Sequence, residues 1–352
     1  MKVTTSLLLS AAMLAAVPAA AQNAEETPII TFKTNIYDQY GASNAFHIVI
    51  GSDIETDYLD IDAGYGPFEA EIEPWTVDTE AGTISGGTAI PLNVSPEGIV
   101  KIYGDPKLVN YFNAKGCYID WIDIDACTSL TVLELSHNEL KSLDLSALPS
   151  LYMVDLTGNT FSAASPLIVG KDHPALTILD LSITDWIDPS FNISDYPALA
   201  SFSGYSCKTL YNVDPTGCPN LQRLSLDLAP VSTLDVSKNP KLAVLNISDT
   251  RVTSIDLSQN PNRSEFYASH VSGFVNVGYK LSPVDISKNT NLRVLSLAGN
   301  GYETIDLSKN PHLFDVNLSR NKLSEIDLSA NPNVYNLSLI HISEPTRLRR
   351  IS

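Results

Sequence analysis

The chain has 352 residues, with 22 lysines and arginines against 40 aspartates and glutamates, and a formal net charge of −18 at pH 7. The chain is longer than a typical single domain, so we expect more than one folded unit. A chain this acidic repels nucleic-acid phosphates and anionic membrane surfaces, so we expect neither as a partner.

The first 21 residues have the order of a secretory signal peptide. Lys2 precedes an apolar run from Leu7 to Val17, and small residues end at Ala21. We expect cleavage after Ala21. The apolar run is shorter than the roughly 20 residues that cross a bilayer. The sequence therefore predicts export, to the medium or the outer cell surface, without membrane insertion.

An acidic lead-in, residues 22–27, precedes a string of short alternating runs over residues 28–98. Alternating runs separated by turn residues predict a small β-sandwich-like domain. The run LDIDAGYGPFEAEI, residues 59–72, resembles the strand and turn of a PKD-like domain, although it lacks that family's Trp and Gly-Asp-Gly turn. We expect residues 99–106, IVKIYGDP, to cap the unit that follows.

A repeat dominates the chain from Lys107 onward. One copy, HLFDVNLSRNKLSEIDLSANP, covers residues 312–332. Counted as columns one to twenty-one, it has apolar residues at columns two, five, seven, twelve, fifteen and seventeen and asparagines at columns ten and twenty. Ten complete units begin at Lys107, Ser129, Ser150, Ala175, Ala198, Asn220, Lys241, Asn262, Asn291 and His312.

Such a period predicts a solenoid, because one unit cannot bury its apolar face and stacked units bury it together. The pattern resembles the leucine-rich repeat family, and the doubled form with LDLSKNP resembles secreted leucine-rich repeat proteins of Bacteroides-like bacteria. The resemblance implies a mostly β fold, a solenoid of about ten 21-residue units over residues 99–336, preceded by the small β domain. It also implies an interaction role without specifying a ligand.

Columns ten and twenty predict two ladders of buried side chains that hydrogen-bond the turns. All four cysteines fall in these columns when one inserted residue is allowed in each of their units, which are 22 residues long. A disulfide requires Cα atoms within about 7 Å, and the column positions place the cysteines farther apart, so we favour four buried free thiols over disulfides. The predicted ladder residues are Cys117, Cys127, Asn138, Cys207, Cys218, Asn239, Asn260, Asn289, Asn300, Asn310, Asn321 and Asn331.

Column sixteen is aspartate in eight units. Two interpretations are open, a stripe for cations or a basic partner, and a solvated face whose carboxylates accept hydrogen bonds from local turns. We favour the second, and we expect no metal site, because no paired Cys or His spacing is present. The aspartates are Asp123, Asp144, Asp214, Asp235, Asp256, Asp285, Asp306 and Asp327.

Two units, which begin at Ser150 and Asn262, are longer than the others. Insertions in solenoids form loops, often at a binding face. Aromatic side chains in such loops are typical anchors for protein or sugar ligands, and ordinary loop packing is the alternative. The predicted ligand-binding residues are Tyr267, His270, Phe274 and Tyr279 of the second long unit, and Trp186 of the unit at Ala175, where a place in the core or at the rim is the alternative.

No motif of a nucleophile, a zinc hydrolase or a phosphate loop is present, so we expect no enzyme and no cofactor. The leading hypothesis is a secreted or cell-surface, adhesin-like protein that binds a host or bacterial protein. The alternative is an extracellular carbohydrate-binding protein, which needs aromatic platforms on one face.

The chain ends in LSLIHISEPTRLRRIS, residues 337–352, where the repeat pattern fails. Ile342 stands where a ladder asparagine belongs. A capping element or a basic sorting signal could explain this ending. The stretch LSLIHISEPTR, however, resembles one reading frame of a common transposase-type sequencing adapter. We therefore expect residues 337–352 to be foreign and the natural repeat to be interrupted near Asn336.

Overall fold

The computed structural model describes residues 27–36, 46–53, 57–78, 83–271, 278–339 and 347–349. The predicted signal peptide, most of the predicted lead-in, Phe274 and most of the tail lie outside these ranges. The regular elements described there are strands and two short 3-10 helices, η2 (Pro106–Leu108) and η3 (Ile193–Asp195). None of the described residues forms a helix with the length and apolar character needed to cross a bilayer.

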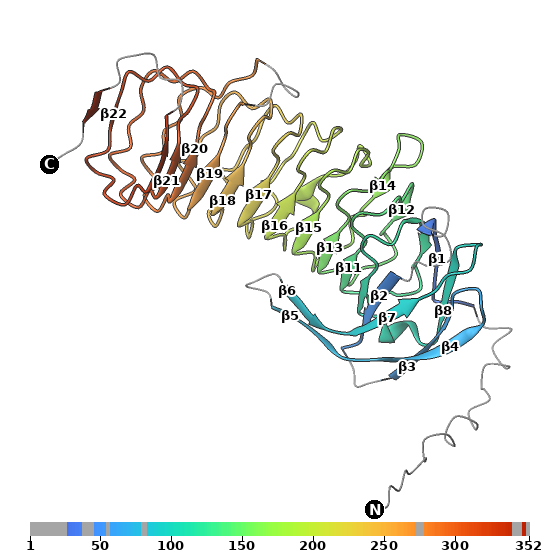
Figure 1. The fold of residues 1–352 in the computed structure, drawn as a ribbon. Helices are drawn as coiled ribbons and strands as arrows, with labels where there is room; N and C mark the ends of the chain where they lie inside the picture. The colour runs from blue at the N-terminus through green and yellow to red at the C-terminus, as the bar shows by residue number, and fades with distance from the viewer. Residues whose placement is uncertain are drawn as a thin grey trace, which may run out of the picture.

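The chain winds into an elongated solenoid in which each repeat unit forms one coil (Figure 1). Successive coils each add one parallel strand to a 13-stranded sheet. The prediction of a mostly β repeat solenoid is confirmed. The coil strands are β9 (Tyr111–Asn113), β11 (Val132–Glu134), β13 (Met153–Asp155), β15 (Ile178–Asp180), β16 (Ser201–Ser203), β17 (Arg223–Ser225), β18 (Val244–Asn246), β19 (Glu265–Tyr267), β20 (Val294–Ser296), β21 (Asp315–Asn317) and β23 (Asn336–Ser338).

The middle residue of each coil strand, column five, points into the core. In-register pairing places these residues directly on one another, for example Phe112 on Leu133 and Leu133 on Val154. All three are fully buried. Because side chains alternate along a strand, the first and third residues of each strand face outward. Stacking therefore buries the middle column completely from β9 to β21, and most of the outward residues are half-buried.

Other strands lie on the opposite face of the coils. Two parallel pairs are described there, β12 with β14 and β22 with β24. The first coil contributes β10, which joins a sheet from the N-terminal segment. The bounds are β10 (Ile119–Asp123), β12 (Leu143–Asp144), β14 (Leu167–Ile168), β22 (Glu325–Asp327) and β24 (Arg347–Arg349).

The N-terminal strands extend both faces of the solenoid. β2 pairs antiparallel with β9 and with β7 at the end of the large sheet. β1 pairs antiparallel with β10 in a five-stranded sheet of order β10-β1-β8-β3-β4, and β5 pairs with β6. The bounds are β1 (Ile30–Thr34), β2 (Phe46–Gly51), β3 (Asp57–Asp62), β4 (Pro67–Ile72), β5 (Trp75–Asp78), β6 (Thr83–Gly86), β7 (Thr88–Leu92) and β8 (Ile99–Tyr103).

This pairing gives the N-terminal segment and the solenoid one continuous core. The ring of Phe32 lies 6.4 Å from those of Phe46 and Phe112. The sequence assigned the capping role to residues 99–106, whose strand β8 lies between β1 and β3. The strands paired directly with the first coil are β1 and β2. They cover the apolar end that a terminal repeat would otherwise expose.

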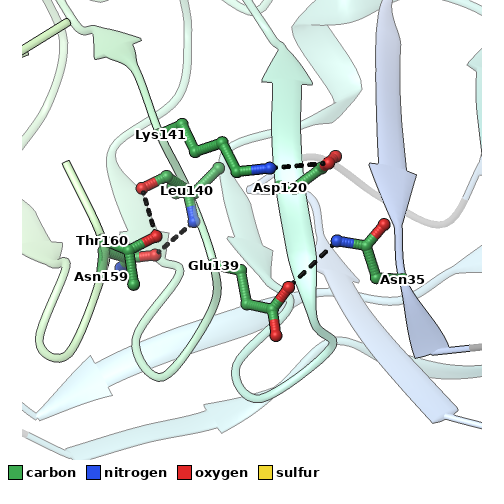
Figure 2. A network of polar contacts seen from close by, with 7 residues as sticks. All are labelled: Asn35, Asp120, Glu139, Leu140, Lys141, Asn159 and Thr160. Carbon is green, nitrogen blue, oxygen red and sulfur yellow. Dashed lines mark hydrogen bonds and ion pairs between the residues drawn. The ribbon is translucent and has the colours of Figure 1, made fainter. Parts of the chain in front are cut away.

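Polar side chains reinforce the junction between the N-terminal strands and the first coils (Figure 2). Asn35 donates from Nδ2 to Glu139 Oε2 at 3.0 Å, which links residues 104 positions apart. Lys141, in the next coil, forms an ion pair at 3.4 Å with Asp120 of β10. Exposed pairs contribute little, so the shared apolar core carries most of the stability of the junction.

Eight coils turn sharply at column nine, three residues after the coil strand ends. Gly158 and Gly299 have φ values of 71° and 77° there, but His137, Ile183 and Leu228 have similar values of 56°, 56° and 63°. Positive φ is strained for a β-branched residue. Because the coil on each side fixes the backbone, the repeat imposes this conformation even on isoleucine.

Candidate functional site

The turn that follows column nine forms one flank of the solenoid, and two exposed tyrosines meet a half-buried arginine on it. The Arg251 guanidinium carbon lies 5.8 Å from the ring centroid of Tyr211 and 5.9 Å from that of Tyr279. Tyr211 is 52% exposed and Tyr279 is 40% exposed. We call Tyr211, Arg251 and Tyr279 the aromatic–arginine cluster. It combines a cation with two accessible ring faces.

Three different coils supply the cluster. Tyr211 comes from the coil that begins at Ala198, Arg251 from the one at Lys241, and Tyr279 from the long coil at Asn262. The Arg251 backbone N–H donates to Val231 O at 2.8 Å, which anchors this residue to the intervening coil. Each cation–π contact contributes about 0.5–1 kcal/mol at an exposed site. Two such contacts restrict the side-chain conformations of Arg251 in the free protein.

Neighbouring residues make the same flank partly apolar. Trp186, a predicted ligand-binding residue, is 41% exposed, and Ile183 at the strained turn is 45% exposed. Asp185 and Lys208 form an ion pair at 2.8 Å between adjacent coils. The flank therefore offers rings, an aliphatic side chain and charges along several consecutive coils.

The other predicted ligand-binding residues make internal contacts. Tyr267, at the end of β19, donates its hydroxyl to Glu265 Oε2 at 3.0 Å, and burial raises its pKa to about 12. His270 Nε2 lies 3.2 Å from Thr250 O. Both side chains are half-buried. Phe274 lies outside the described residues. The structure thus brings only Tyr279 of this set into the cluster, beside two residues that the sequence did not single out.

Another group of exposed aromatic side chains lies near the C-terminal end of the 13-stranded sheet. The rings of Phe314 and Tyr335 stack with centroids 5.6 Å apart and an interplanar angle of 8°. They line an open hollow of about 700 Å³ together with Arg293, His312 and Asn333. Flat rings beside amide and guanidinium donors can hold a ligand with an apolar face and hydroxyl groups.

The column-ten asparagines bridge adjacent coils through both ends of the side-chain amide. Asn138 donates to Ala114 O at 2.8 Å and to Leu135 O at 2.9 Å, while its oxygen accepts from the backbone of Cys117 and Ile119 at 3.0 Å. Asn159, Asn300 and Asn321 repeat this pattern. Each of these amides therefore links its own turn to the preceding coil.

The column-twenty asparagines use their amide hydrogens alone. Asn260 donates to Val236 O and to Asn239 O, both at 2.9 Å. The other four members do the same with the coil before them. The coils that begin at Ser150 and Ala175 place other residues on this side. Buried His173 contacts Leu148 O and Val169 O there, and Tyr196 donates to Gly170 O.

The four cysteines are free and buried. Cys207 Sγ donates to Leu181 O at 2.8 Å and Cys218 Sγ to Ile193 O at 3.0 Å. Burial raises the pKa of all four thiols to about 12. A thiol this hard to ionise is a poor nucleophile and a poor metal ligand. The cysteines therefore act as small hydrogen-bond donors in place of asparagine.

The column-sixteen aspartates bind their own turns. In each of the eight, Oδ1 accepts from the backbone N–H two residues later, as in Asp256 with Ser258 at 2.8 Å. This hydrogen bond lowers the pKa of Asp256 below its usual range. No group of three or more His, Cys, Asp or Glu side chains in the described ranges is placed to hold a metal ion.

Comparisons with known proteins point to the same fold. A family model described as "Leucine Rich repeat" matches residues 126–148. No curated protein matches the chain. A leucine-rich repeat protein of Leptospira interrogans is 20% identical with a TM-score of 0.53, over 64% of this chain and 57% of that one. This chain is therefore similar to little more than half of the Leptospira protein, and at this identity the likeness shows the fold alone.

Two Listeria monocytogenes structures are also similar. The functional domain of InlJ, reported to include a cysteine ladder, is 18% identical over 73% of this chain and 68% of that one, with a TM-score of 0.48. The internalin inlF is 14% identical over 71% of this chain and 85% of that one, with a TM-score of 0.47.

Proposed function

We propose that this chain is an exported, non-enzymatic scaffold that binds a protein partner at or beyond the cell surface, as an adhesin does. The aromatic–arginine cluster is the observation that carries the proposal. The solenoid holds it on a rigid flank, and the signal-like N-terminus supports export. The acidic surface argues against nucleic acid and anionic membrane as partners.

The residue types of the cluster are those that dominate binding energy in protein interfaces. Tyrosine and arginine are enriched at positions where truncation costs more than about 2 kcal/mol. Ordering a long side chain on binding costs about 0.5–1.5 kcal/mol. Arg251, already held between Tyr211 and Tyr279, has lost part of that freedom in the free protein. The cluster therefore suits an anchor that meets an acidic or aromatic group of the partner.

The test is a screen of the mature chain against an array of purified extracellular protein domains. Binding to any hit should weaken at least about tenfold in Arg251→Ala and in Tyr211→Ala, because each change removes one anchor. Arg223→Ala is the matched control, since Arg223 is exposed on β17 outside the cluster. Equal binding by the cluster variants and the control would contradict the assignment of this flank.

Carbohydrate binding is the second candidate function, and the stacked pair Phe314 and Tyr335 supports it. Here a neutral oligosaccharide would lie over the ring faces and accept hydrogen bonds from Arg293 and Asn333. A glycan array probed with the native chain and with Phe314→Ala separates the two functions. Hits lost in Phe314→Ala and kept in Arg251→Ala favour the sugar function, whereas an array without hits contradicts it.

A further inference from the structure

A second hollow lies on the opposite face of the solenoid, over its first three coils. β10, β12 and β14 supply its floor, and Ala164, Ser165 and Pro166 of the first long coil form one wall. Its volume is about 480 Å³. Trp121 and Ile168 present apolar surface there, with 44% and 36% of their areas exposed. The insertion that lengthens this coil thus borders a recess rather than a flat face.

Carboxylates surround this apolar floor. Asp123, Asp125 and Asp144 line the hollow, and none of its eleven lining residues is basic. Burial, then the negative charges of Asp123 and Asp144, raise the pKa of Asp125. The three groups therefore repel one another in the free protein. A positively charged ligand would relieve this repulsion as it binds.

Two lysines of the adjoining segments, Lys33 and Lys141, are not among the residues that line the recess. Lys33 stands opposite Trp121 across the pairing of β1 with β10, and it does not line the hollow. Lys141 is held by Asp120. The cation–π contacts among the described residues involve Arg251 and Arg263, so none uses the ring of Trp121. The indole face is thus accessible beside three acidic groups.

These features select the chemistry of the ligand. A bare metal ion does not fit, because Oδ1 of Asp123 and of Asp144 accepts a backbone N–H and the described carboxylates do not converge as a metal site. A hydrated ion would also gain nothing from the Trp121 ring. A guanidinium or ammonium group uses both parts of the recess, since it stacks on the indole and pairs with carboxylates.

The length of the recess indicates a peptide. Neighbouring coils stack about 4.8 Å apart, so three coils present a strip roughly 10–14 Å long, the span of three or four extended residues. We propose that this hollow is a docking site for a basic peptide segment, with an arginine or lysine side chain stacked on Trp121. The site is separate from the aromatic–arginine cluster and does not depend on it.

Fluorescence anisotropy tests the proposal with the mature chain. The probe is a fluorescein-labelled peptide with two arginines among glycines and serines, and its counterpart carries the neutral isostere citrulline. We expect the arginine peptide to bind at least about tenfold more tightly and to lose affinity as salt is raised, because the exposed charges are screened. Equal affinity for the two peptides would overturn the proposal.

Two variants place the binding in the recess. Trp121→Ala should weaken the arginine peptide at least about threefold through the lost cation–π contact, and Asp125→Asn should weaken it without removing apolar area. Tyr65→Ala and Asp306→Asn, at exposed positions elsewhere, should bind as the native chain does. Unchanged binding in both recess variants would exclude this location. Binding of a neutral oligosaccharide, lost in Trp121→Ala, would identify a sugar surface instead and overturn the peptide assignment.

Discussion

Replacing Arg263 with leucine should stabilise the protein. Arg263 occupies column two, where the adjacent coils have Leu242 and Leu292, and all three side chains are fully buried. The three guanidinium nitrogens have no hydrogen-bond partner among the described residues. The cation lies 5.7 Å from the ring of Phe266. The repeat thus places a charge in a leucine column, which is costly without a partner.

The cost can be estimated from the ionisation of the side chain. Burial lowers the pKa of Arg263 to about 9, well below the ordinary value near 12.5, which corresponds to about 5 kcal/mol. Because the folded pKa lies below the unfolded one, this penalty is complete below about pH 9 and shrinks as the pH rises above it. Relaxation reduces the effect, and apolar replacement of buried charges gains about 1–4 kcal/mol. We expect Arg263→Leu to gain about 2–4 kcal/mol.

Thermal unfolding at pH 7 measures the gain, and hydrogen exchange of β18 to β20 locates it, because repeat arrays can unfold in parts. A rise of about 3–6 °C in the unfolding midpoint is expected for a chain of this length. Arg293→Leu removes the same charge from an exposed position in the next coil and should leave the midpoint unchanged. A midpoint that falls or stays constant in Arg263→Leu would refute the reasoning and show that Arg263 has a stabilising partner.

Three further predictions concern the side chains at columns ten, sixteen and twenty of the repeat. Asn260→Ala should cost about 2–4 kcal/mol, because two buried carbonyls lose their donors, whereas Asn262→Ala, at an exposed position, should cost under about 0.5 kcal/mol in denaturant unfolding. The four thiols, with pKa values raised to about 12 by burial, should resist a thiol reagent at pH 8 and react only on unfolding; rapid native labelling would contradict their burial. The pKa of Asp256 is lowered chiefly by the N–H of Ser258, so this carboxylate stabilises the fold above about pH 4 and the contribution is lost as the pH falls. Unfolding midpoints measured from pH 6 to pH 2 should therefore depend less on pH in Asp256→Asn, and an unchanged slope would exclude this contribution.

The repeat could be predicted because its information is local and recurs in every coil. Column five alone identifies Phe112, Leu133 and Val154 as core residues, and in-register stacking follows from a constant period. The arrangement of the N-terminal strands is different. The pairing of β2 with β9 joins residues far apart in the chain, and alternation of apolar residues does not specify which distant strand becomes the neighbour.

The candidate site was harder to predict for a related reason. Tyr279 stood out in a long unit, whereas Tyr211 and Arg251 occupy units of nearly regular length and have no distinctive local pattern. Their proximity arises from stacking three coils. A comparison of residues at neighbouring columns across successive units would have found the cluster, because residues one or two coils apart lie within reach of long side chains.

The cysteines offer a test of what the ladder requires. Cys207 donates a hydrogen bond to the carbonyl of Leu181. In other coils, column-ten asparagines donate to the equivalent carbonyl. If hydrogen bonding is the requirement, Cys207→Val should cost about 1–2 kcal/mol, because a similar volume is kept and a buried carbonyl loses its donor. Cys207→Asn should be at least as stable as the native chain, since the amide restores that donor and adds an acceptor for the preceding coil. Urea unfolding of the two variants decides the matter. If valine proved neutral and asparagine destabilising, then packing rather than hydrogen bonding would select the residue at this column.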